Sequence, residues 1–292
     1  MDGNLAKRPF ESRLCEENMK ISKFAVVSFV AIFQASSLTV ANSVPTITPK
    51  QESNVVALFK AFASSDPDKI ASASVKYTKA GSAAREFAEM IKNNHATIRY
   101  FKSINAFGMP SGLAVTPETK GTSKFSNESI TLNSVNNSFD GKYYNFKFDS
   151  KGKITDFNVT TSTGSSGAKV SDRIFTLEQT VTNGQVLATG GFIYKTPENK
   201  TFIQVEVKNN SASLKSWSYA GGKYGSAENK YYDAAIDPTG CLYPGQKAFM
   251  QSVVDASPVI VAGTGAAFEA PTFEGCGAGS SKSQSTLRFN TK

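Results

Sequence analysis

Histidine, cysteine and tryptophan are scarce in this chain of 292 residues, which has one histidine, three cysteines and one tryptophan. A metal site built from histidine and cysteine needs several such ligands close together, and His95 lies far in sequence from every cysteine. Hydrolysis by a serine–histidine pair would have to use His95, but no Gly-x-Ser-x-Gly turn surrounds any serine. We therefore expect no catalytic residues, no metal ion and no cofactor.

The chain also lacks an apolar run long enough to span a bilayer, which takes about 20 residues. Its longest run, residues 24–33, is interrupted only by Ser28, follows Lys20 and Lys23, and precedes small and polar residues. This order is typical of a signal peptide, with an uncleaved anchor as the alternative. We expect residues 1–41 to be a pre-sequence and signal peptide.

The eighteen residues before Met19 are polar and mixed in charge, unlike the start of a signal peptide, so we expect translation to begin at Met19. The mature chain is then secreted or extracytoplasmic, and soluble after cleavage without a transmembrane segment. Cys241 and Cys276 remain in it and can form one disulfide in an oxidising compartment. A shared metal ion is the competing interpretation for these two cysteines.

The charge balance is basic, with a formal net charge of +8 at pH 7. Excess positive charge favours association with anionic polymers and surfaces. No run of five basic residues occurs, so a nucleic-acid partner is not indicated. The expected partner is an anionic envelope polymer or another surface protein, and the plainer interpretation is a soluble basic protein.

Helical periodicity dominates the first part of the chain. Val55, Leu58 and Phe62 share one helical face, and Asp66 is a suitable N-cap for a second helix. The clearest apolar stripe runs over residues 82–101. His95 lies beside that stripe, where a partly buried helix residue is the simpler interpretation than a catalytic base.

The period changes to two in residues 140–160, where Tyr144, Phe146 and Phe148 are expected on one face and residues 149–153 supply a turn. Helices followed by antiparallel hairpin strands predict an α+β domain over residues 53–161.

A Ser-, Thr- and Gly-rich linker is predicted at residues 162–169, followed by an all-β sandwich over residues 170–262 and a loop-like, Gly/Ser-rich tail over residues 263–292. The strands expected in the sandwich are residues 173–181, 185–196, 200–210, 213–221, 230–236 and 247–255.

Two segments of this second half carry a resemblance. "FIQVEVKNNS" (202–211) is an alternating strand ending in an Asn-rich turn, and "CLYPGQKAFMQSVV" (241–254) is a Pro-Gly turn leading into a late strand. They resemble the immunoglobulin-like extracellular domains of unknown function in exported bacterial proteins. The resemblance implies a fold and transfers no functional residues.

The first half, with its helices followed by "FKFDSKGKITDFNV" (146–159), resembles more weakly the cone-shaped domains related to nuclear transport factor 2. That resemblance implies an alternative function: a small-molecule-binding or enzymatic cone domain, with a cavity that includes His95 and the sandwich as an accessory module. Few strands are visible between residues 102 and 140, where that fold needs more.

Aromatic residues next to lysine suggest a binding surface, because tyrosine and tryptophan stack on sugar rings and lysine attracts anions. The segment "WSYAGGKYG" (217–225) gives the candidate binding residues Trp217, Tyr219, Lys223 and Tyr224. A strand with one core face is the alternative. We predict an exported, non-catalytic binding or interaction protein of the cell envelope or extracellular space.

Overall fold

The computed structural model describes residues 47–292 apart from 65, 104–120, 134–138, 165–166, 179, 183–185, 218–222, 226–230, 234, 238–240, 259, 261–264, 275–281 and 291–292. The predicted pre-sequence and signal peptide, and Cys276, lie outside the described residues.

The described residues contain three α-helices: α1 (Pro49–Phe62), α2 (Pro67–Tyr77) and α3 (Ala83–Ser103). Asp66 caps α2 as predicted, because its side chain accepts hydrogen bonds from the backbone N–H groups of Asp68 and Lys69. The start of α1 is fixed by a capping box, in which Thr48 and Gln51 each bond the backbone N–H of the other.

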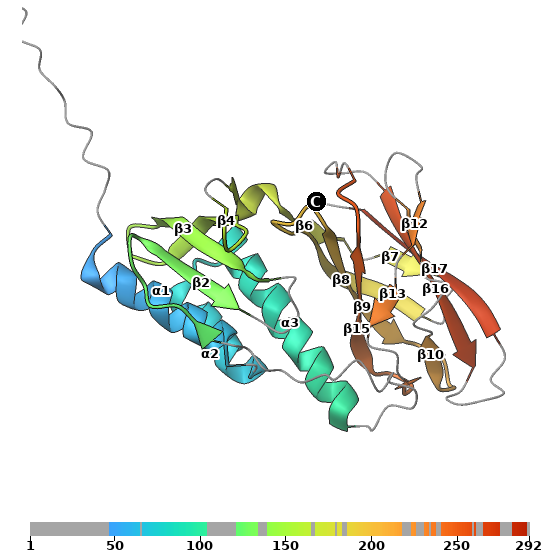
Figure 1. Cartoon of the computed structure of the whole chain (residues 1–292). Helices are drawn as coiled ribbons and strands as arrows, with labels where there is room; N and C mark the ends of the chain where they lie inside the picture. The colour runs from blue at the N-terminus through green and yellow to red at the C-terminus, as the bar shows by residue number, and fades with distance from the viewer. Residues whose placement is uncertain are drawn as a thin grey trace, which may run out of the picture. The chain divides into compact units, whose positions relative to one another are not determined.

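The first sheet has five antiparallel strands in the order of the chain. They are β1 (Gly121–Thr122), β2 (Ser129–Asn133), β3 (Gly141–Phe148), β4 (Ile154–Thr160) and β5 (Ala168–Lys169). The predicted hairpin over residues 140–160 is confirmed as β3 and β4. The helices pack on one face of this sheet, and α1 and α2 lie side by side (Figure 1).

The predicted face of β3 is wrong in one respect. Tyr144 was expected on the same face as Phe146, but the structure buries Tyr143 together with Phe146. The register of β3 against β4 shifts after Tyr144, and Asn145 has a φ of +54°. An extra residue in a β-bulge reverses which side chains face inward, so strict alternation fails at Asn145.

The remainder of the described chain contains one 3₁₀ helix and twelve strands. They are η1 (Val170–Asp172), β6 (Ile174–Leu177), β7 (Thr180–Thr182), β8 (Val186–Lys195), β9 (Thr201–Asn209), β10 (Lys215–Trp217), β11 (Lys223–Gly225), β12 (Tyr231–Asp233), β13 (Ala235–Asp237), β14 (Cys241–Leu242), β15 (Lys247–Val254), β16 (Gly265–Glu274) and β17 (Lys282–Asn290).

These strands form two antiparallel sheets of six strands each. One sheet has the order β13-β15-β9-β8-β6, with β7 on β8, and the other has the order β12-β11-β16-β10-β14, with β17 on β16. The predicted order of helices first and antiparallel strands afterwards is therefore confirmed.

The C-terminal segment differs from the expected loop-like tail. Residues 265–274 and 282–290 form β16 and β17, which pair along nine positions, and β16 also pairs with β10 and β11. Glycine and serine at the ends of the segment, together with Pro271, suggested a loop. The segment "AAFEAPTFE" (266–274) does not alternate strictly, so the local sequence indicates this strand only weakly.

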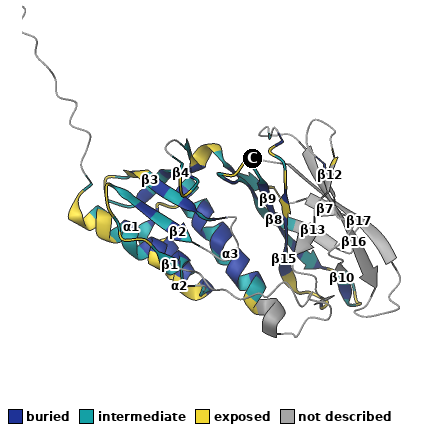
Figure 2. Cartoon of the chain, in the orientation of Figure 1, coloured by how far each residue is buried: buried dark blue, intermediate teal, exposed yellow. Residues whose placement is uncertain are grey.

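One buried cluster of aromatic side chains, the aromatic core, joins the helices to both the first sheet and the strands that follow it. Figure 2 shows buried residues running through α1, α3, β3, β8 and β9. The members of the aromatic core are Phe59, Phe62, Phe87, Phe139, Tyr143, Phe146, Phe157, Tyr194 and Phe202. Because Tyr194 and Phe202 come after the predicted linker, the two predicted domains share this core.

The predicted linker itself is partly structured. Its last two residues form β5, paired with β4. Gly167 donates its backbone N–H to the Tyr144 hydroxyl at 2.8 Å, and a Cβ on Gly167 would lie 2.1 Å from the Val159 carbonyl oxygen. Only glycine allows this approach. The glycine content of the predicted linker therefore reflects close packing at Gly167 and not only flexibility.

Candidate functional site

The predicted binding residues Trp217, Lys223 and Tyr224 do not all share one face of their sheet. Trp217 pairs with Thr272 of β16, and Tyr224 pairs with Phe268, four positions away. Strand residues alternate between faces and paired residues share a face. Trp217 and Tyr224 therefore lie on the same face, whereas Lys223, the neighbour of Tyr224, lies on the opposite one.

Tyr224 is only 1% exposed, so its ring belongs to the interior of the protein. Tyr219 lies outside the described residues. Cys241 begins β14 and pairs with Ser216 of β10, while its predicted disulfide partner Cys276 is among the residues not described. The disulfide stays a prediction, as does binding by Trp217.

His95 is buried on α3, with 7% of its surface exposed. Removal from water disfavours the charged imidazolium and lowers the pKa of His95 to about 4. Its Nδ1 atom has no hydrogen-bond partner among the described residues. Burial on α3 and the low pKa fit the simpler interpretation of His95 as a partly buried helix residue.

Burial of His95 predicts loss of stability in acid. The unfolded chain takes up a proton near pH 6.5, whereas the native His95 does so only near its pKa of about 4. Stability is therefore undiminished by this group above pH 6.5 and falls as the pH drops toward 4. One pKa unit is worth about 1.4 kcal/mol, so the loss should reach about 3 kcal/mol. Urea unfolding between pH 4 and 7 measures it.

The matched control is His95→Gln, which carries no charge at any of these pH values. Carboxylates titrate in the same range in both proteins, so the difference between the two stability curves isolates His95. Curves that stay parallel from pH 7 to pH 4 would contradict the prediction.

Four lysines from two separate segments gather at one end of α2, and we call them the lysine cluster: Lys76, Lys79, Lys151 and Lys153. The turn between β3 and β4 reaches this place because the Lys153 ammonium donates to the Val75 carbonyl oxygen at 3.0 Å. The Lys79 backbone N–H also donates to the Ile154 carbonyl oxygen at 2.9 Å. A cation at a helix C-terminus is favoured by the helix dipole.

One carboxylate, Asp149, lies among these cations. Its Oδ1 accepts hydrogen bonds from the backbone N–H of Lys153 at 2.8 Å and of Lys151 at 2.9 Å. The hydrogen bond from Lys153 does most to lower the pKa of Asp149, and the charges of Lys79 and Lys151 contribute further. Asp149 thus stabilises the turn between β3 and β4. Lys76, Lys79 and Lys151 are exposed to solvent.

An apolar side chain stands at the centre of the cluster. Val75 is 60% exposed, next to Lys76 and at the carbonyl that Lys153 bonds. The Lys76 ammonium lies 5.1 Å from the centre of the Tyr77 ring, within cation–π range. Cations, an aromatic ring and an aliphatic group are therefore combined on one exposed surface.

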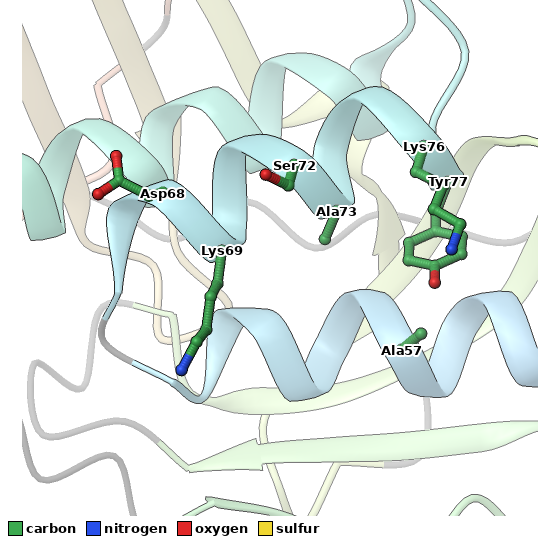
Figure 3. A pocket seen from close by; sticks show the side chains of 7 residues that line it. All are labelled: Ala57, Asp68, Lys69, Ser72, Ala73, Lys76 and Tyr77. Carbon is green, nitrogen blue, oxygen red and sulfur yellow. The ribbon is translucent and has the colours of Figure 1, made fainter.

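The lysine cluster adjoins an open groove of about 480 Å³ between α1 and α2, which we call the α1–α2 groove. In Figure 3, Lys69 stands toward one end of the groove, and Lys76 with Tyr77 at the other. Its lining residues are Ala57, Asp68, Lys69, Ser72, Ala73, Lys76 and Tyr77. Small side chains in the middle leave room between the charged ends.

The acidic residue of the groove is already paired. The Arg99 guanidinium of α3 donates to the Asp68 carboxylate at 2.9 Å. This hydrogen bond and the charge of Arg99 lower the pKa of Asp68. Asp68 therefore stays ionised, and the charge of Arg99 balances its own.

The arrangement concentrates positive charge, which attracts anions. Within the described part of the chain, no group of three or more histidine, cysteine, aspartate or glutamate side chains is placed to hold a metal ion. None of the helices there combines the length and apolar character needed to cross a membrane.

No protein-family model and no curated protein sequence matches this chain.

Proposed function

We propose that this chain is an exported, non-catalytic binding protein that attaches to an anionic polymer of the cell envelope through the lysine cluster. The observation that carries this proposal is the convergence of Lys76, Lys79, Lys151 and Lys153 from two segments about seventy residues apart. Positive charge gathered from two segments in this way attracts an anionic ligand.

Export and fold belong to the same proposal. The basic and apolar order of residues 19–43 supports secretion. The two antiparallel sheets that follow residue 170 support an immunoglobulin-like sandwich. It comes after the helix-containing domain along the chain and would serve as an accessory module. The formal net charge of +8 favours anionic partners for the whole chain.

The packing of the interior argues against the alternative, a small-molecule cavity beneath the helices. Rings of the aromatic core lie at contact distances there: Phe59 is 4.8 Å from Tyr143, and Phe87 is 5.5 Å from Phe157. Side chains at these separations occupy the space that a ligand would need. His95 is not among the members of this core.

Co-sedimentation with isolated cell envelopes tests the proposal. The protein without residues 1–41 should pellet at about 0.01 M salt and much less at about 0.15 M, because the Debye length falls from about 30 Å to about 8 Å. Lys79→Glu combined with Lys151→Glu should abolish most of the binding at low salt, since it reverses two charges of the lysine cluster.

The matched control reverses two exposed lysines of α1, Lys50→Glu with Lys60→Glu, and changes the net charge equally. Equal losses in both double variants would mean that overall charge, and not the lysine cluster, drives binding. Trp217→Ala provides a second comparison. If only that variant fails to pellet, the binding site lies in the sheet of β10 and the partner is one recognised by aromatic stacking.

A further inference from the structure

The α1–α2 groove has a spacing of charges that deepens the proposed function and rests on it. Lys69 and Lys76 are seven residues apart in α2, and two helical turns rise about 10 Å. Seven residues also return to nearly the same helix face, so both side chains flank the same groove. Figure 3 shows them at its opposite ends.

Between Lys69 and Lys76 the groove is lined by small side chains that carry no charge. Ala73 and Ser72 of α2 line its middle, and Ala57 of α1 lies opposite Tyr77 (Figure 3). At one end the Tyr77 ring carries a second hydroxyl. This lining fits a segment that is neutral, compact and rich in hydroxyl groups, such as a polyol or a sugar.

The cations are lysines, which bind the oxygens of phosphate or carboxylate as compact point charges. Lys69 also lies 3.7 Å from Asp66, but this ion pair is exposed and weak enough for a ligand to compete with it. Two cationic ends separated by an uncharged, hydroxyl-bearing middle match a polymer whose anions alternate with neutral units. In a phosphodiester polymer of polyols or sugars the phosphates join such neutral units, so phosphate is the anion that fits this alternation.

We propose that the α1–α2 groove binds a linear phosphodiester polymer of polyol or sugar units, with phosphates at Lys69 and Lys76 and an uncharged unit between them. Because the groove is open, the polymer can extend beyond its ends. Lys76 belongs to both the groove and the lysine cluster, so a polymer that extends past Lys76 would meet Lys79 and Lys151. A single phosphate cannot engage both ends of a groove of this length.

Isothermal titration calorimetry at low salt tests this with three ligands: a synthetic hexamer of glycerol phosphate, the glycerol phosphate monomer, and a glutamate hexapeptide. The first should bind at least about tenfold more tightly than either of the others. Lys69→Gln with Lys76→Gln should weaken hexamer binding by about tenfold. Ser72→Phe, which fills the groove without changing its charge, should weaken it as well.

Lys50→Gln with Lys60→Gln is the matched control, because it removes two exposed cations of α1 outside the groove and should leave hexamer binding within about twofold. All substituted side chains are exposed, so the circular dichroism spectra should remain unchanged. Equal hexamer affinities in the groove variants and the control would overturn the inference, and so would monomer or glutamate peptide binding as tightly as the hexamer.

Envelope sedimentation of the same proteins separates this inference from the proposed function. If the unsubstituted protein pellets and the groove variants pellet equally well, the groove inference fails and the envelope function stands. If the hexamer binds in the groove but the unsubstituted protein does not pellet, the envelope function fails and the phosphodiester site stands.

Discussion

Replacing Phe87 by alanine is expected to cost about 3–5 kcal/mol of the free energy of unfolding, the usual range for deleting a buried aromatic ring. Phe87 has no exposed surface and lies on the face of α3 that meets the first sheet. Its ring centre is 5.5 Å from that of Phe157, 5.9 Å from Tyr143 and 5.3 Å from Tyr194. Alanine would leave these three rings without their common neighbour.

Urea denaturation followed by far-ultraviolet circular dichroism measures this loss. The control is Tyr243→Ala, which also removes a ring, but one that is 49% exposed, and it should change stability by less than about 0.5 kcal/mol. A Phe87→Ala protein as stable as the Tyr243→Ala protein would show that the aromatic core is not packed around Phe87.

Local chemistry made the helical part of the fold predictable. Asp66 could be identified as an N-cap because a short acceptor side chain before a helix bonds free backbone N–H groups wherever the helix packs. The start of α1 at Pro49 could have been predicted from Thr48 and Gln51, whose spacing is that of a capping box. We placed the first helical residues later because they are polar.

Strand positions were harder to predict, because pairing depends on residues far away in the sequence. The bulge at Asn145 reverses the faces of Tyr143 and Tyr144. The local sequence indicates it only by the presence of asparagine, a residue that tolerates a positive φ. Similarly, β16 lies inside its sheet because β17 pairs with one of its edges while β10 and β11 pair with the other. Composition alone made this segment resemble a tail.

The candidate site was missed for a related reason. A search for runs of basic residues cannot find the lysine cluster, because Lys79 and Lys151 are brought together only by the contacts of the β3–β4 turn with α2. The spacing of Lys69 and Lys76 was visible in the sequence, but it acquires meaning only when α1 packs beside α2 to form a groove. Binding by Lys223 and Tyr224, in contrast, was inferred from their adjacency along the chain, which in a strand places neighbours on opposite faces.

The second large effect is expected at Tyr194, which ties the strands after the predicted linker to the helices before it. Tyr194 of β8 is fully buried, and its ring centre lies 5.3 Å from that of Phe87 on α3. Close by, the Gln204 side-chain amide of β9 donates to the Met90 carbonyl oxygen at 3.2 Å. Tyr194→Ala should therefore destabilise both parts of the chain together, by about 3–5 kcal/mol.

Two signals follow the two parts separately during thermal unfolding. Circular dichroism at 222 nm reports on α1, α2 and α3, and the fluorescence of Trp217, the only tryptophan in the sequence, reports on the sheet of β10. If the shared core couples the parts, both transitions coincide and shift down together by about 10 °C in Tyr194→Ala. If residues 162–169 separate independent domains, the transitions differ and only one of them moves.

Tyr194→Phe isolates the ring from the hydroxyl. The Tyr194 hydroxyl is buried and has no hydrogen-bond partner among the described residues, so removing it leaves no new unpaired group. We expect Tyr194→Phe to unfold at the same temperature as the unsubstituted protein or slightly above it. A loss in Tyr194→Phe as large as in Tyr194→Ala would assign the coupling to the hydroxyl. A loss in Tyr194→Ala alone assigns it to aromatic packing, which makes the helices and the sheet of β8 and β9 one folding unit.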